Sequence, residues 1–111
     1  MTKNIKNKED IQPIEVMKGV IRRTLLYNDS LMLCYFKLEK NAVIPMHKHK
    51  EHQIGYIIKG RIKFITENDE FIAKMGDSYI FDSYEKHGAE ILDDAEVIDV
   101  FNPPRDDYKN E

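Results

Sequence analysis

The chain has 111 residues, which fits one compact domain, because two domains of half that length would each lack a sufficient core. Hydrophobic residues make up 41% and charged residues 33%, as in soluble globular proteins, and the formal net charge of -3 argues against a nucleic-acid partner. Cys34 is the single cysteine, so a disulfide within the chain and a CxxC metal motif are excluded, and we expect its thiol to be inert packing. The polar start and the absence of a membrane-length apolar run predict a cytoplasmic protein without a membrane partner.

Residues 1–18 are polar or of mixed character around Pro13, and we interpret them as an N-terminal arm. From residue 19 to residue 111 we predict one barrel domain, in which short β-type runs alternate with turn residues. No run has the spacing of a long amphipathic helix, so the pattern indicates an all-β sandwich or barrel. The predicted strands cover residues 20–27, 31–38, 43–49, 53–59, 61–66, 71–74, 78–81, 87–92 and 96–101.

The last predicted strand is apolar on both faces. Val97, Asp99 and Phe101 share one face, because side chains alternate along a strand. Ile98 and Val100 share the other face, whereas a strand with water on one side usually alternates apolar and polar residues. We therefore expect both faces to be covered, one of them by a second sheet or by a partner subunit. A homodimer is the preferred interpretation, with the arm available to pair with a neighbour's sheet edge.

Three of the four histidines lie in the stretch PMHKHKEHQ, residues 45–53. His47 and His49 stand at positions i and i+2 of a predicted strand, so both imidazoles point the same way, as ligands of a divalent transition metal would. The alternative is that these histidines are solvated residues of a polar loop, and spacing alone leaves it open. Further possible ligands are Glu51, His52, Gln53 and His87.

The spacing resembles the two motifs of the cupin family. The first cupin motif runs H-x-H, three residues, Glu or Gln, six residues and Gly, and the chain matches it from His47 to Gly60. The second runs Gly, five residues, Pro, and a histidine five positions later, and Gly76 to His87 keeps both distances. Asp82 stands where this motif has Pro, and Tyr84 stands where it has Gly, which alters a turn and leaves the ligand positions intact.

The resemblance implies a small double-stranded β-helix, the jelly-roll-like cupin barrel, with one divalent metal ion inside. Zinc, nickel, manganese and iron all remain open, because occupancy follows supply as well as affinity. Three neutral imidazoles and a neutral amide would leave the ion its full +2 charge, which favours Lewis-acid chemistry over oxygenase or oxidase chemistry. Glu51 and His52 are then expected to be bystanders. The implied ligands are His47, His49, Gln53 and His87.

The C-terminal stretch VIDVFNPPRDDY, residues 97–108, is the second informative segment. Pro103-Pro104 cannot continue a strand ladder, so we expect the chain to leave the sheet after Asn102 and to carry Arg105 across a rim. Asp99 lies within the strand. It is either a buried acid/base or a structural carboxylate bonded to the backbone or to Arg105.

With HQIGYIIKGRIKF and GDSYIFDSYEKHGAE, this ending resembles the KdgF-type cupins, pectin-degradation proteins that open the ring of unsaturated uronates. The resemblance implies that Asp99 is the catalytic acid/base and that Arg105 and Phe101 bind a small polar or anionic substrate. Lys50-Glu51-His52 stands where the family commonly has Pro-His-Glu, so the cavity mouth differs. The alternatives are a metal-dependent ligand-binding protein without turnover and, on fold alone, a dioxygenase.

Overall fold

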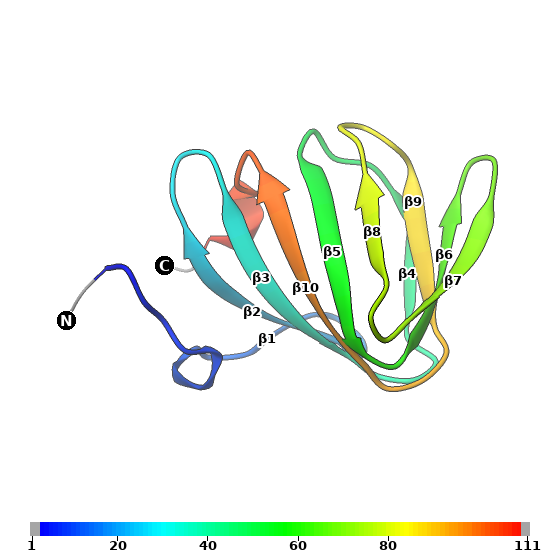
Figure 1. The fold of residues 1–111 in the computed structure, drawn as a ribbon, viewed down its shortest axis with the longest axis horizontal. Coiled ribbons are helices and arrows are strands. Elements are labelled where there is room, and N and C mark those ends of the chain that lie inside the picture. Colours follow the sequence, from blue (N-terminus) through cyan, green and yellow to red (C-terminus); the bar gives the residue numbers. More distant parts are fainter. Residues whose placement is uncertain (1–2, 110–111) are drawn as a thin grey trace.

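The computed structural model describes residues 3–109, so the first two residues of the predicted arm and the last two of the predicted barrel domain lie outside it. Figure 1 shows strands that form two sheets facing each other, which confirms the predicted all-β class. Within residues 3–109, no helix has the length and hydropathy needed to cross a membrane. The elements of this part of the chain are η1 (Lys8–Asp10), β1 (Ile14–Met17), β2 (Val20–Tyr27), β3 (Met32–Leu38), β4 (Val43–His47), β5 (His52–Lys59), β6 (Arg61–Thr66), β7 (Glu70–Lys74), β8 (Ser78–Phe81), β9 (His87–Ile91), β10 (Ala95–Asn102) and η2 (Asp106–Tyr108).

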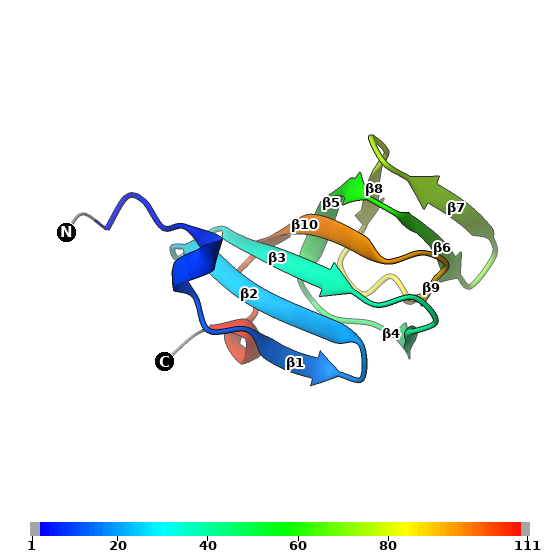
Figure 2. The same cartoon turned by 90° about the horizontal axis from the view of Figure 1, so that it is seen from below.

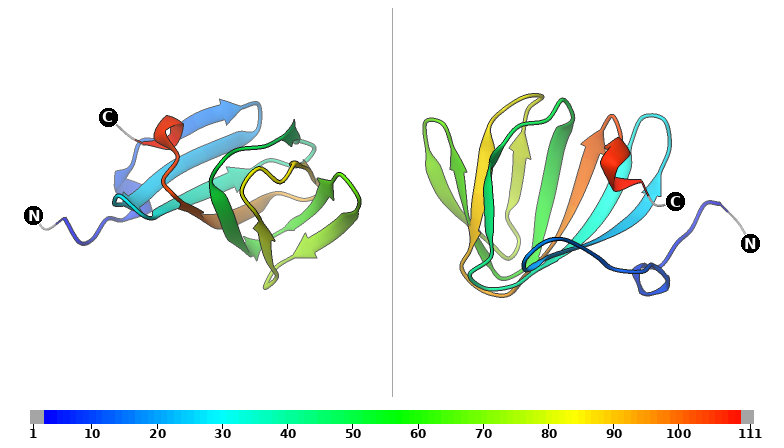
Figure 3. Two further views of the ribbon diagram at one scale, coloured as in Figure 1. Left: turned by 90° about the horizontal axis from the view of Figure 1, so that it is seen from above. Right: turned by 180° about the vertical axis from the view of Figure 1, so that it is seen from behind.

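The strands are antiparallel throughout and form a larger and a smaller sheet. The larger sheet has the order β1-β2-β3-β10-β5-β8, and the smaller sheet has the order β4-β9-β6-β7. Figures 2 and 3 show the larger sheet extending beyond the smaller one on the side of β1 to β3, where the C-terminal η2 lies on its inner face. There the Thr24 hydroxyl donates to the Tyr108 carbonyl at 2.6 Å, which ties η2 to β2.

Alternation along the strands builds the core between the two sheets. On β10, Val97 and Phe101 are buried on the inner face, while Ile98 and Val100 are only partly covered on the outer face. Cys34 on β3 is fully buried, and burial raises the pKa of its thiol to about 12, in agreement with inert packing. The predicted alternation therefore places the apolar residues correctly.

Two strands differ from the sequence prediction by more than one residue at an end. β4 ends at His47, two residues earlier than expected, so His49 stands in the following loop. Residues 14–17 of the predicted arm form β1, which pairs with β2 of the same chain. β1 was missed because it is an edge strand with mostly exposed side chains. The division into an arm over residues 1–18 and a barrel domain over residues 19–111 stays a prediction.

Tyr84 stands where the cupin motif has glycine, and its backbone keeps the conformation that favours glycine. Its φ is +62°, in the left-handed region, and its N–H donates to the carbonyl of His49 at 2.7 Å. The turn between β8 and β9 is thus preserved at the cost of strain in Tyr84.

Replacing Tyr84 with glycine is expected to stabilise the protein by about 0.5–1 kcal/mol, because the strain is relieved and the Tyr84 side chain is largely exposed. Urea unfolding measures the change. Tyr84→Ala is the matched control, since it removes the ring and keeps the Cβ atom. A Tyr84→Gly protein no more stable than Tyr84→Ala would contradict the account.

Candidate metal and substrate site

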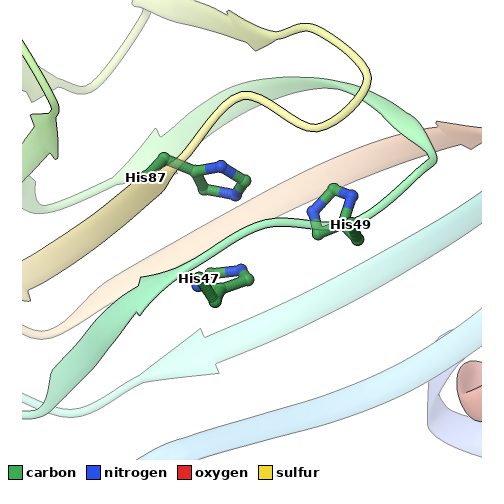
Figure 4. Close-up of side chains that lie close together, drawn as sticks. All are labelled: His47, His49 and His87. Carbon is green, nitrogen blue, oxygen red and sulfur yellow. The ribbon is translucent and has the colours of Figure 1, made fainter.

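Three histidines converge at one end of the barrel (Figure 4). His47 ends β4, His49 lies in the loop after it, and His87 begins β9. One ligand nitrogen of each lies within 4.8 Å of the other two. β4 and β9 are paired with His47 opposite His87, and these two ring centroids are 4.4 Å apart. The pairing of two strands and a short loop therefore gathers the three imidazoles.

The backbone fixes the tautomer of each ring. In all three histidines Nδ1 lies within hydrogen-bonding distance of a carbonyl oxygen two residues away. A carbonyl only accepts, so each Nδ1 carries the hydrogen and each Nε2 keeps its lone pair for a ligand. The acceptors for His47, His49 and His87 are, in order, Pro45 at 2.9 Å, Glu51 at 2.9 Å and Glu85 at 2.8 Å.

Gln53, the fourth predicted ligand, begins the inward-facing row of β5 and lies beside this cluster. Its Oε1 is 3.2 Å from His49 Nε2. Because the hydrogen of His49 is on Nδ1, both of these atoms present lone pairs to each other. A cation between them would satisfy both, so the donor set fits a divalent transition metal.

Burial keeps the imidazoles of His87 and His49 in the neutral form that binds metals. It lowers the pKa of His87 to about 4, with the neighbouring histidines and Arg105 acting in the same direction. Burial is also the main cause that lowers the pKa of His49. The ring of Phe81 stacks in parallel on His87 with centroids 4.1 Å apart, which holds the imidazole in place.

The two expected bystanders differ from each other. His52 is exposed, and its Nδ1 accepts a hydrogen bond from the N–H of Ser83 at 3.2 Å, so it is a surface histidine as predicted. Glu51 is only 6% exposed, and its Oε1 lies 3.6 Å from His49 Nδ1. It therefore supports a candidate ligand from behind, a role that the sequence prediction missed.

Asp99 points into the barrel from β10 and is buried. The hydroxyl of Tyr79 on β8 donates to Asp99 Oδ1 at 2.6 Å. Burial raises the pKa of Asp99 to about 6, against hydrogen bonds from Tyr79 and Gln53 and the charge of Arg105. The Asp99 carboxylate thus accepts hydrogen bonds from the side chains of Tyr79 and Gln53. The sequence did carry a signal for Tyr79: alternation on the predicted strand 78–81 places it on the same inward face as Phe81.

Gly55 gives Asp99 and Tyr79 room to meet. It lies between them in the register of the larger sheet, paired with Asp99 on one side and with Tyr79 on the other. A Cβ atom at this position would lie 2.2 Å from both Asp99 Oδ1 and Tyr79 Cζ. Two buried side chains therefore occupy the volume that any larger residue would need.

Gly55→Ala is expected to destabilise the protein by about 1–3 kcal/mol, because a methyl group must displace Asp99 or Tyr79 in a packed interior. Denaturant unfolding measures the loss. Gly76→Ala serves as a comparison, since a Cβ there meets no atom within 4 Å and only the backbone, at φ +92°, is strained. If Gly55→Ala unfolds at the wild-type midpoint, the tight contact is wrong.

A cavity of about 340 Å³ joins these groups, a size that suits a small molecule. Val16 and Met17 of the predicted arm also contribute to its wall, which the sequence analysis did not foresee. The predicted site residues on the wall are His47, Gln53, His87, Asp99, Phe101 and Arg105.

Arg105 lies at the rim of this cavity, and its positive charge is partly balanced by Asp107. Its Nε and Nη2 donate to the carboxylate of Asp107 at 3.3 and 3.0 Å. Its guanidinium carbon also lies 3.9 Å from the centroid of the Tyr108 ring and 5.4 Å from that of Phe101. Arg22, which is buried, approaches the same Tyr108 ring at 4.4 Å. The aromatic contacts fix the direction of the Arg105 guanidinium.

The fold and these motifs define the class of the protein. Residues 34–101 match the cupin domain family, and the chain belongs to that family. This confirms the resemblance drawn from the spacing of His47, His49, Gln53 and His87. The three-histidine cluster lies where the two motifs meet in space.

The similar proteins narrow the class. The chain is 34% identical to the pectin degradation protein KdgF of Dickeya dadantii (strain 3937) over 96 residues, which are 85% of this chain and 87% of that protein. Its fold matches the structure of KdgF from Halomonas sp. with a TM-score of 0.90 and 29% identity, over 97% of this chain and 100% of that one. It is also 34% identical to H2HPP isomerase of Bacillus subtilis over 64 residues, 56% of this chain and 27% of that protein.

Proposed function

We propose that this protein is a metal-dependent enzyme that opens the ring of a 4,5-unsaturated uronate monosaccharide to its linear keto form. The observation that carries the proposal is a buried carboxylate, Asp99, on the wall of the same cavity as His47 and His87 of the three-histidine cluster. Two relatives support the reaction class: one is named for pectin degradation and the other as an isomerase, and opening this ring is an isomerisation. Cys34 is a free thiol, which suits the reducing cytoplasm where we place the protein.

In this proposal one divalent ion, zinc, nickel, manganese or iron, is held by His47, His49, His87 and Gln53. When bound, it would supply Lewis acidity to a substrate hydroxyl or carbonyl oxygen, undiminished by any anionic ligand. The neutral donor set also makes a dioxygenase the weaker alternative.

Asp99 is proposed to move the proton. Opening the ring removes the proton of the anomeric hydroxyl, breaks the bond between the anomeric carbon and the ring oxygen, and adds a proton to the enol carbon, so atoms and charge balance. Tyr79 donates to Oδ1 and, together with a hydrogen bond from Gln53, orients the carboxylate toward the cavity that it lines. A carboxyl pKa of about 6 lies close to neutral pH, where a group accepts and returns a proton most readily.

Arg105 is proposed to hold the substrate carboxylate. Asp107 accepts hydrogen bonds from Nε and Nη2, and Nη1 makes no hydrogen bond within residues 3–109. A guanidinium has five N–H donors, so a carboxylate can bind Nη1 while Asp107 stays in place. The ring of Phe101, whose centroid lies 5.9 Å from that of His49, supplies an apolar wall beside the reacting carbons.

The experiment is an absorbance assay on tag-free, metal-loaded protein. Ring opening removes the conjugated double bond, so the ultraviolet absorbance of the unsaturated monosaccharides from pectin lyase and alginate lyase digestion should fall faster than in buffer. If neither sugar is opened faster than in buffer with metal bound, the ring-opening proposal fails. A non-catalytic metal-dependent ligand-binding protein then takes its place.

A further inference from the structure

Arg22 on β2 is a buried cation without an anion. Like Val20 and Thr24 it lies on the inner face of the larger sheet, and it is only 6% exposed. Its Nε is buried without a hydrogen-bond partner, and no other buried side-chain nitrogen or oxygen of residues 3–109 lacks one. Its guanidinium also makes no ion pair within this part of the chain. The carboxylates that pair with the other arginines are those of Glu9 for Arg23, Asp93 for Arg61 and Asp107 for Arg105.

Folding alone does not account for such a residue. A guanidinium gives up its water when it is buried, and without hydrogen bonds or a counter-charge this loss is not compensated. The guanidinium carbon of Arg22 lies 4.4 Å from the centroid of the Tyr108 ring. A cation–π contact of this kind recovers only part of the loss. A buried donor without a partner therefore points to a role other than stability.

Tyr108 connects Arg22 to the cavity. Its ring is on the cavity wall, whereas Arg22 lies behind the ring and outside the wall. The guanidinium carbon of Arg105 lies 3.9 Å from the centroid of the same ring. Figure 3 shows η2, which ends at Tyr108, against the inner face of the larger sheet, where the Thr24 hydroxyl donates to the Tyr108 carbonyl. Two positive charges therefore flank this end of the cavity, one at its rim and one behind its wall.

Arg22 supplies the charge that Asp107 takes away from Arg105. The Asp107 carboxylate lies 3.0 Å from Arg105 Nη2, so this pair is close to neutral as a whole. Arg22 has no such partner and leaves this end of the cavity positive. Burial raises the pKa of Tyr108, and the charges of Arg105 and Arg22 both act against that rise, so both are felt at the cavity wall. Solvent weakens such a charge less in a partly buried site than at the surface.

We propose that Arg22 is a positioning residue through which the cavity selects an anionic sugar over its neutral counterpart. The ligand carboxylate lies at Arg105, and Arg22 attracts it from behind the Tyr108 ring without touching it. Because Arg22 has no carboxylate of its own, its charge acts on the ligand undiminished. The anion in turn supplies the counter-charge that the protein does not. This inference rests on the proposed function, since it concerns the same cavity and takes a uronate as the ligand.

Calorimetric titration of tag-free, metal-loaded protein with D-galacturonate and with D-galactose tests the proposal. The two sugars differ only at the carbon that carries the carboxylate, and neither has the double bond of the proposed substrate. We expect the wild-type protein to bind galacturonate more tightly than galactose. Arg22→Met should weaken galacturonate binding by about 10-fold, the effect of one nearby charge in a partly buried site, and leave galactose binding unchanged. Because the titration needs no turnover, a protein that fails the absorbance assay can still pass this test.

Arg23→Met is the matched control, because Arg23 follows Arg22 on β2 and points to the opposite face, where its Nε donates to the Ile11 carbonyl at 3.2 Å. It removes the same charge and should leave the preference for galacturonate unchanged. Arg22→Lys keeps the charge and should keep most of the affinity. Since Arg22→Met removes an unpaired buried donor, its urea midpoint should equal or exceed that of the wild type.

A wild-type protein that does not prefer galacturonate would overturn the proposal. The same holds if Arg22→Met binds galacturonate as the wild type does, if it weakens both sugars equally, or if Arg23→Met shows the same loss. Arg22→Lys that binds galacturonate as weakly as Arg22→Met would show that the charge is not what matters. If Arg22→Met does not fold, or unfolds at a lower urea concentration than the wild type, Arg22 is a structural residue and the inference fails.

Discussion

Asp99→Asn is expected to lower the rate of ring opening by about 10²–10⁴-fold, the contribution of a positioned acid/base. Asparagine keeps the shape of the side chain and can still accept the hydrogen bond from Tyr79, but it cannot carry a proton between substrate atoms. The metal content should stay at the wild-type level. Steady-state rates from the absorbance assay, together with elemental analysis of the same samples, measure both quantities.

Asp29→Asn is the control for this prediction, because Asp29 is an exposed carboxylate in the turn between β2 and β3. It should leave rate and metal content unchanged. If Asp99→Asn retains more than about a tenth of the wild-type rate, Asp99 is not the acid/base.

The same substitution should stabilise the metal-free protein at neutral pH. Burial raises the pKa of Asp99 from 3.8 to about 6, so ionising this carboxyl costs about 3 kcal/mol of folding free energy at pH 7. Below pH 3.8 the group is protonated in both the folded and the unfolded state, and the cost vanishes. The metal-free wild-type protein should therefore lose stability relative to Asp99→Asn as the pH rises from about 4 to 6. Urea unfolding across this range measures the difference.

His49→Ala and His87→Ala are expected to weaken metal binding by more than about 100-fold, since even residues that only support a ligand typically contribute 10–100-fold. Each variant removes one Nε2 lone pair from a cluster of three whose nitrogens lie within 4.8 Å of one another. Elemental analysis of tag-free protein after dialysis against a chelator measures the loss.

His52→Ala provides the matched control, because His52 is exposed and lies outside the cluster. Its metal content should equal that of the wild type. Wild-type protein with sub-stoichiometric metal that does not decrease further in His49→Ala or His87→Ala would disprove the metal site.

The strands were predictable because their signal is local. Alternation and turn residues define β2, β6 and β8 with the bounds that the structure has, and Pro103-Pro104 marks the end of β10 at Asn102. β1 lacks this signal, since it pairs at an edge and buries little. β4 ends early where its register with β9 shifts between Ile44 and His47. Such a shift depends on the backbone hydrogen bonds between the two strands, which the alternation of side chains in the sequence does not reveal.

The candidate ligands were predictable because they follow from motif spacing, whereas the contacts that support them depend on packing and were not. His47, His49, Gln53 and His87 follow from the motifs, and the structure brings them together. The contacts of Tyr79 with Asp99 and of Glu51 with His49 depend on how strands and loops meet. Pairing of a rim arginine with a residue two positions later, as in Arg105 and Asp107, is likewise set by the turn geometry of η2.

The most direct test of the central claim, that this protein isomerises an unsaturated uronate with Asp99 as proton carrier, is nuclear magnetic resonance of the early product formed in heavy water. The linear keto sugar should appear faster than in buffer, with one deuterium in a single configuration at the former enol carbon, because Asp99 delivers it from one face. Asp99→Asn should give slow product with deuterium in both configurations. Wild-type product formed at the buffer rate, with both configurations equally populated, would contradict the account.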